Sequence, residues 1–196
     1  MKYGVNSLIF SAGFSHDDME LFPKIKELGF DVFEIALADK GHIDPPRVAD
    51  ELAKNGLACP SVCGLFGEDR DLRGPNKEHM KNAVQYIKDL IDSVKGLGGD
   101  RVVGPLYSAV GRANMEEPAA RKEQWENCRE GLKELCDYAE KRGVFLGLEP
   151  LNRFETDFIN ICEDALKMVD DVGSDRLGVH LDTFHMHIEE KDSAAA

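Results

Sequence analysis

The sequence predicts an α/β fold of the TIM (β/α)8 barrel type, of which about six β/α units are present. Three observations support this fold class. Short apolar, β-branched segments alternate with amphipathic helical segments along the 196 residues. A glycine follows several helical segments shortly before the next strand, so that a helix–glycine–strand unit recurs. Two strands end in a carboxylate, and barrel enzymes gather their functional groups at the carboxyl ends of their strands.

The expected strands are short and mostly apolar. Few of them alternate cleanly between apolar and polar residues, which is typical of parallel strands covered on both faces. They are expected at residues 3–9, 32–37, 58–64, 101–106, 144–149 and 177–182. No GxGxxG motif follows the first strand, which disfavours a dinucleotide-binding sheet.

Helical periodicity fills the segments between these strands. Three long apolar stripes recur at three- and four-residue steps, within residues 80–97, 125–139 and 161–172. Two shorter helices are expected at residues 21–28 and 46–54. Pro23 suits the first turn of a helix, where an N–H group has no helical partner.

Residues 1–196 are expected to form a single barrel domain with one substantial core. A closed barrel needs eight β/α units in about 250 residues, whereas about six units are readable here. Residues 189–196 are typical of the start of a helix. We therefore expect the domain to be incomplete at its C-terminus.

The composition limits the classes of partner and compartment. The chain has 37 acidic and 24 basic residues, and its net charge of −13 repels phosphate backbones and anionic lipid surfaces. Nucleic acid and membranes are therefore not expected as partners, and no apolar run approaches the roughly 20 residues that cross a bilayer. The cysteines are odd in number, without a CxxC motif, and no secretory leader pattern precedes the first strand. We expect reduced thiols and a cytoplasmic location.

Two acidic residues stand out by their position. Glu149 and Asp182 end the fifth and sixth strand segments and lie 33 residues apart, about the length of one strand–helix–strand unit. In a parallel sheet, that spacing puts both carboxylates at the carboxyl ends of neighbouring strands. Their oxygens are hard ligands that suit Mg²⁺, Mn²⁺ or Co²⁺. From spacing alone, two simpler interpretations stay open: each acid caps a following helix, or pairs with Arg153.

Two segments carry a resemblance to a known family. EPLNRFE at residues 149–155 and LDTFHMHIEE at residues 181–190 resemble signature segments of the D-tagatose 3-epimerase and D-allulose (psicose) 3-epimerase family, which belongs to the xylose isomerase-like TIM barrels. MKYGV at residues 1–5 and ELGFD at residues 27–31 are also similar to that family. The resemblance runs the length of the chain and is most specific in the first two segments.

The resemblance implies a metal-dependent ketose 3-epimerase. It implies that Glu149 and Asp182 hold a divalent ion, commonly Mn²⁺, with a histidine and a glutamate from a seventh and an eighth strand. Glu149 would also be catalytic, because it would move the proton at C3 of a ketose through an enediolate. Glu155 and His185 match positions that bind substrate hydroxyls. Arg153 is expected to brace a ligand carboxylate.

Other interpretations of the same barrel stay open. Hydroxypyruvate isomerase, inosose dehydratase and an endonuclease share the superfamily, although the net charge of −13 disfavours the endonuclease. A catalytically incompetent fragment that associates as a homo-oligomer through open strand edges is a different class of function. Residues 6–9 and 107–110 depart from the pattern of many ketohexose epimerases, so a pentulose competes with a hexose as the expected substrate.

Overall fold

The computed structural model describes residues 1–114 and 117–196 and confirms the predicted fold class, a six-stranded part of an α/β TIM barrel. Every neighbouring pair of strands is parallel, and the strands lie in the order of the sequence. This is the topology expected of consecutive β/α units. The strands are β1 Gly4–Asn6, β2 Val32–Leu37, β3 Ser61–Gly64, β4 Arg101–Gly104, β5 Phe145–Leu148 and β6 Leu177–Val179.

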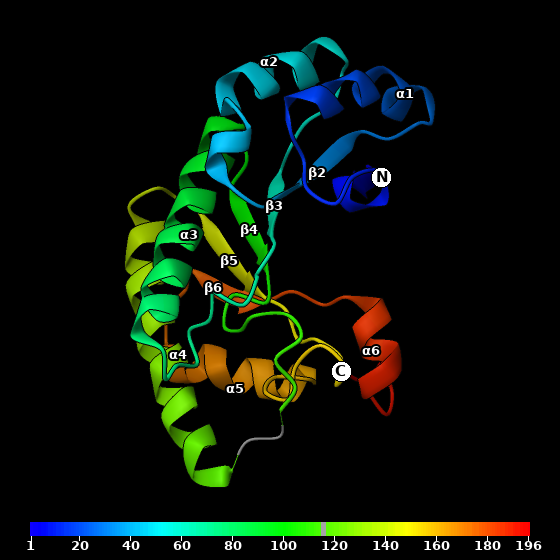
Figure 1. Cartoon of the computed structure of the whole chain (residues 1–196). Helices are drawn as coiled ribbons and strands as arrows, with labels where there is room; N and C mark the ends of the chain where they lie inside the picture. The colour runs from blue at the N-terminus through cyan, green and yellow to red at the C-terminus, as the bar shows by residue number, and fades with distance from the viewer. Residues whose placement is uncertain (115–116) are drawn as a thin grey trace.

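Helices alternate with the strands along the chain. The α-helices are α1 Phe22–Glu27, α2 Pro45–Lys54, α3 Lys77–Gly96, α4 Pro118–Glu140, α5 Cys162–Val172 and α6 Thr183–Glu189. Three short 3-10 helices are η1 Ser7–Ile9, η2 His16–Leu21 and η3 Lys40–His42. Figure 1 shows α3, α4 and α5 along one side of the curved sheet, whereas α6 lies apart from that layer. The side of the sheet opposite these three helices is therefore not covered by them.

Strand β2 illustrates how the sheet separates its two faces. Phe33, Ile35 and Leu37 are fully buried in the core beneath the helices. Because successive side chains of a strand alternate, Glu34 points to the inner side of the sheet. There its carboxylate accepts a hydrogen bond of 2.7 Å from the Asn6 side chain of β1. At this level of β2, the inner side of the sheet is therefore polar, whereas the outer side is apolar.

Several strands are shorter than the sequence pattern predicts, for identifiable reasons. β1 ends at Asn6 because this side chain accepts a hydrogen bond from a backbone N–H two residues later and so begins η1. β3 begins at Ser61, directly after Pro60, which has no N–H to give to the ladder. β6 ends at Val179 because the chain then turns into α6.

The prediction of a helix that begins at residue 189 is wrong. The helix in this region, α6, lies earlier, over Thr183–Glu189, and Glu190 is extended with a ψ of 143°. Both acidic residues at this point are held by other elements. Glu189 pairs with Arg153, and Glu190 accepts a 2.7 Å hydrogen bond from the backbone N–H of Cys162. These contacts fix the end of α6 at the place where the sequence pattern suggested a beginning.

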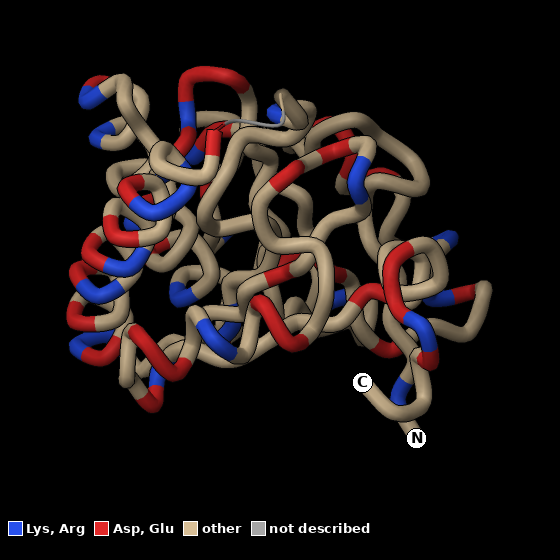
Figure 2. Tube along the Cα trace, turned by 90° about the horizontal axis from the view of Figure 1, so that it is seen from below, with Lys and Arg blue, Asp and Glu red and all other residues tan. Residues whose placement is uncertain are grey.

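Charged residues are spread along the chain rather than collected in one segment. Figure 2 shows Lys and Arg positions scattered among Asp and Glu positions on helices and loops. Within the described ranges, no helix is both long enough and apolar enough to span a bilayer. The absence of nucleic acid as a partner stays a prediction from the net charge of −13.

Candidate active site

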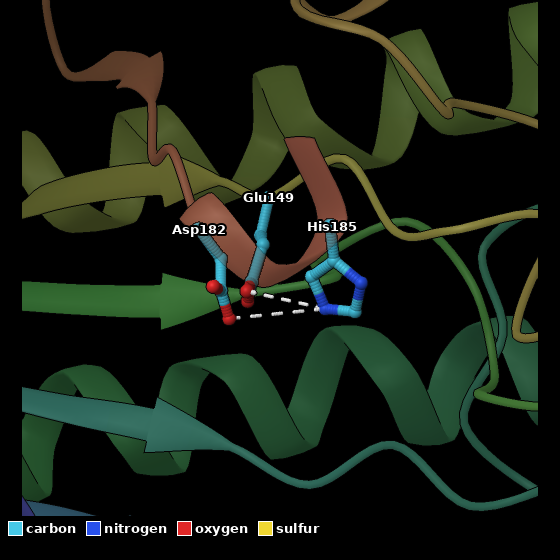
Figure 3. Close-up of side chains that lie close together, drawn as sticks. All are labelled: Glu149, Asp182 and His185. Carbon is cyan, nitrogen blue, oxygen red and sulfur yellow. Dashed lines mark ion pairs between the residues drawn. The ribbon is translucent and has the colours of Figure 1, made fainter. Parts of the chain in front are cut away.

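Glu149 and Asp182 converge at the carboxyl ends of β5 and β6, as their spacing predicts. Glu149 directly follows β5, and its backbone N–H donates to the Gly104 carbonyl oxygen at 3.0 Å. Because Leu148 is fully buried against the helices, alternation turns Glu149 to the inner side. One potential ligand atom from each of Glu149, Asp182 and His185 lies within 4.8 Å of the others. Figure 3 shows these three side chains pointing toward a common space.

Asp182 has two tasks, one for each carboxylate oxygen. It is the N-cap of α6, and its Oδ1 accepts a 2.7 Å hydrogen bond from the backbone N–H of Phe184. The simpler interpretation that this acid caps a helix is therefore correct as far as it goes. The second oxygen, Oδ2, faces the site and lies 3.9 Å from Nε2 of His185. One oxygen of Asp182 thus remains available for a ligand.

Glu149 is a buried carboxylate that lacks a donor. Its residue is 8% exposed, and its carboxylate accepts no hydrogen bond from residues 1–114 or 117–196. Burial, as the largest cause, and the negative charges of Asp182, Glu34 and Glu155 together raise the pKa of Glu149 to about 8. An acid in such surroundings is stabilised either by a proton or by a cation.

The donor set fits a small divalent cation. Ligand atoms bound to one ion at 2.0–2.6 Å lie at most about 5 Å apart, and one such atom from each of Glu149, Asp182 and His185 lies within 4.8 Å of the other two. Such ions take about six ligands, so the carboxylates of Glu149 and Asp182 would supply only part of a coordination shell. Binding of a metal, and the choice of Mn²⁺, stay predictions.

His185 is oriented as a hydrogen-bond donor toward the carboxylates. It is 7% exposed, and its Nδ1 accepts a 3.1 Å hydrogen bond from the backbone N–H of Asn152. In the neutral ring, an acceptor at Nδ1 requires the proton on Nε2. Nε2 lies 3.8 Å from Oε1 of Glu149 and 3.9 Å from Oδ2 of Asp182, too far for direct hydrogen bonds. An oxygen between these groups could accept from Nε2–H, which suits the predicted contact with substrate better than a metal bond.

The two remaining predicted site residues, Glu155 and Arg153, have different partners in the structure. Glu155 lies on the loop after β5, where its Oε1 accepts a 2.7 Å hydrogen bond from the side chain of Asn152. Arg153 instead forms a two-pronged ion pair with Glu189, with distances of 2.9 and 2.8 Å. Arg153 therefore braces α6, the helix that carries His185, and contacts neither Glu149 nor Asp182 through a described ion pair.

Sequence reasoning assigned no role to two residues near the site. Asn152 is 2% exposed and contacts both Glu155 and His185, although the sequence marked it only by its place within the 149–155 segment. Glu34 on β2 is half-buried on the inner side of the sheet, with the Ser61 hydroxyl as one donor. A charged residue between two apolar strand residues was the available signal for Glu34.

Comparison with known proteins shows similarity over nearly the whole chain. Residues 22–196 match the family model of the xylose isomerase-like TIM barrel. The chain is 32% identical, over all of its length, to an L-ribulose 3-epimerase of Mesorhizobium japonicum. It is 30% identical, again over its full length, to a D-psicose 3-epimerase of Ruminiclostridium cellulolyticum. The crystal structure of a D-allulose 3-epimerase from Methylomonas sp. in complex with D-allulose superposes on 100% of the chain with a TM-score of 0.91 and 28% identity.

These relatives are longer than the chain described here. It spans 65% of the Mesorhizobium protein, 67% of the Ruminiclostridium protein and 67% of the Methylomonas chain. The similarity therefore covers the segment that contains the described carboxylates.

Proposed function

Because the chain belongs to the xylose isomerase-like TIM barrel family, and within it to the ketose 3-epimerases, we propose that it acts in a metal-dependent ketose 3-epimerase. One observation carries the proposal. The carboxylates of Glu149 and Asp182 meet at one strand edge with the Nε2 atom of His185 beside them. A hard-cation site next to a hydrogen-bond donor suits a sugar that carries a carbonyl and a neighbouring hydroxyl.

In this proposal Glu149 exchanges the proton at C3. A C–H proton next to a carbonyl is weakly acidic, so its removal needs a base of suitable pKa and stabilisation of the resulting enediolate. In the metal-free protein the pKa of Glu149 is raised to about 8, mainly by burial, and a bound cation would lower it and keep the carboxylate ionised as a base. A divalent cation held by Glu149 and Asp182 would supply charge stabilisation for the oxygens at C2 and C3.

His185 and Glu155 would orient the sugar. The Nε2–H group of His185 would donate to a substrate oxygen, while the carboxylate of Glu155 would accept from a hydroxyl. Inversion also needs an acid on the opposite face of the sugar, and the metal needs more ligands. We propose that two further β/α units, with a histidine and a glutamate at their strand ends, complete both requirements.

The proposal is tested by following C3 in deuterated water. Protein containing the further units is incubated with Mn²⁺ and each of D-allulose, D-tagatose and L-ribulose, and NMR measures both the epimer formed and deuterium at C3. We expect epimer and deuterium to appear together for at least one ketose. Residues 1–196 alone should give no measurable epimer, because the proposal assigns two metal ligands and the second acid to the further units.

Paired variants separate the role of Glu149 from general effects. Glu149→Gln should abolish deuterium exchange at C3 while partly preserving sugar binding. Glu134→Gln is the matched control, because it makes the same change in an exposed residue of α4 that pairs with Lys88. Exchange by the Glu149→Gln protein at close to the wild-type rate would overturn the assignment of Glu149. Absence of any epimer from all three ketoses would overturn the proposed function itself.

A further inference from the structure

Asn152 connects the two residues that are predicted to bind substrate. It lies on the loop after β5 and is 2% exposed, so its polar groups depend on protein partners. Its side-chain Nδ2 donates to Oε1 of Glu155 at 2.7 Å and lies 3.0 Å from Nδ1 of His185. Its backbone N–H donates to the same Nδ1 at 3.1 Å. One residue therefore contacts both Glu155, three residues along the loop, and His185 on α6.

The orientation of the Asn152 amide is fixed by a third contact. Oδ1 accepts a 3.0 Å hydrogen bond from the backbone N–H of Phe154, so the NH₂ end must face Glu155 and His185. Two donors of Asn152 then point at Nδ1 of the His185 ring. A protonated Nδ1 would leave these donors facing an N–H group, which is unfavourable in a buried place. The ring consequently keeps its proton on Nε2, the nitrogen that faces Glu149 and Asp182.

We propose that Asn152 is a positioning residue that sets the tautomer of His185 and the place of the Glu155 carboxylate. Through these two contacts it presents one donor, Nε2–H, and one acceptor to the space beside Glu149. It acts through its neighbours and is not itself a catalytic residue. The pairing of a donor with an acceptor at fixed positions is what discrimination among sugar hydroxyls requires. Only this discrimination among sugars rests on the proposed function, whereas the contacts of Asn152 do not depend on it.

The first test reads the histidine ring directly in residues 1–196 without metal. At a single pH of 8, ¹⁵N NMR reports which ring nitrogen of His185 carries the proton. A scalar coupling between the Asn152 amide nitrogen and Nδ1 reports the hydrogen bond itself. We expect the proton on Nε2 and a measurable coupling. A proton on Nδ1, or the absence of the coupling, would overturn the inference without any variant being needed.

The second test replaces the donor by an acceptor of the same shape. Asn152→Asp puts an oxygen where Nδ2 lies, which attracts a proton to Nδ1 of His185 and repels the Glu155 carboxylate. We expect the ring signals to move toward the Nδ1-protonated form and the coupling to weaken. Asn160→Asp is the matched control: Asn160 lies on the same loop but donates to backbone oxygens of Leu151 and Thr156, at 2.7 and 2.9 Å. The control should leave the ring signals in place even if it lowers stability, and unchanged signals in Asn152→Asp would refute the positioning role.

The third test depends on the proposed function and can fail separately from it. In protein with the further β/α units, Asn152→Ala should lower kcat/KM for the preferred ketose by about tenfold or more. Its affinity for Mn²⁺ should stay within about threefold of wild type, because Asn152 contacts neither Glu149 nor Asp182. An unchanged kcat/KM would refute the positioning role in catalysis. If the wild-type protein turns over no ketose, the proposed function fails, whereas the ring signals still decide the inference about Asn152.

Discussion

Replacing Glu149 by glutamine should change how the stability of the metal-free protein depends on pH. The folded-state pKa of Glu149 is raised from 4.5 to about 8, with burial as the main cause. Between these values the folded protein binds more protons than the unfolded chain. This contribution to the free energy of unfolding is therefore fully present below about pH 4.5 and is lost as the pH rises through the folded pKa.

The size of the effect follows from the two pKa values. At 1.36 kcal/mol for each unit of pKa, raising the pH from 5 to 8 removes about 3 kcal/mol of stability through Glu149. Glutamine has nearly the same shape but does not ionise. The difference in unfolding free energy between Glu149→Gln and wild type should therefore grow by about 3 kcal/mol over this range, in favour of the variant.

Urea denaturation in EDTA, followed by circular dichroism at several pH values, measures this difference. Titrating groups that lie far from Glu149 behave alike in both proteins, so they cancel in the comparison. The exposed control Glu134→Gln should give a difference that does not vary with pH. Addition of Mn²⁺ at pH 8 should stabilise the wild type more than Glu149→Gln, because the cation replaces the proton as the partner of the carboxylate. A difference that stays constant within about 1 kcal/mol from pH 5 to pH 8 would show that Glu149 is not the desolvated acid described here.

Three further predictions address the packing around the site. Arg73→Met should lower the free energy of unfolding by about 3–5 kcal/mol in urea denaturation, because the half-buried Asp157, 2.7 Å from the buried Arg73 guanidinium, loses this counter-charge. A loss below about 1 kcal/mol would contradict this. Leu132→Ala, in the fully buried face of α4, should lower it by about 2–5 kcal/mol through a cavity, and a neutral effect would contradict the packing described. The thiol of Cys63 should react with iodoacetamide at pH 8 at least about tenfold more slowly in the folded protein than in denaturant. The reason is that burial and the charges of Glu34 and Glu149 raise the pKa of this thiol to about 12. Mass spectrometry measures the two rates, and equal rates would contradict this.

The sequence was sufficient for the order and type of the strands because their patterning is local. Runs such as residues 144–149 are apolar without alternation, and a carboxylate at their end is visible in the sequence itself. The convergence of Glu149 with Asp182 followed from topology alone, since neighbouring parallel strands share one edge. The ends of the strands were less predictable, because side chains such as Asn6 compete with the ladder for backbone groups.

The finer parts of the site depend on contacts between segments that are distant in sequence. Asn152 and His185 lie 33 residues apart, and no local pattern indicates that the ring nitrogen of one meets the backbone of the other. The pairing of Arg153 with Glu189 was likewise not predictable from a local pattern, because the position of α6 determines this partner. That helix was expected too late, from residue 189 onward, although the sequence had left open that Asp182 caps a following helix.

The double engagement of Asp182 has a consequence for ion selectivity. Because Oδ1 is held by the first turn of α6, a bound ion meets this carboxylate through Oδ2 alone unless the helix start unwinds. Calcium takes about six to eight oxygens and often uses both oxygens of one carboxylate, whereas magnesium and ions of similar size prefer an octahedral shell with single contacts. If the proposed cation binds, this helix cap would disfavour calcium, because it withholds the second oxygen that calcium would use.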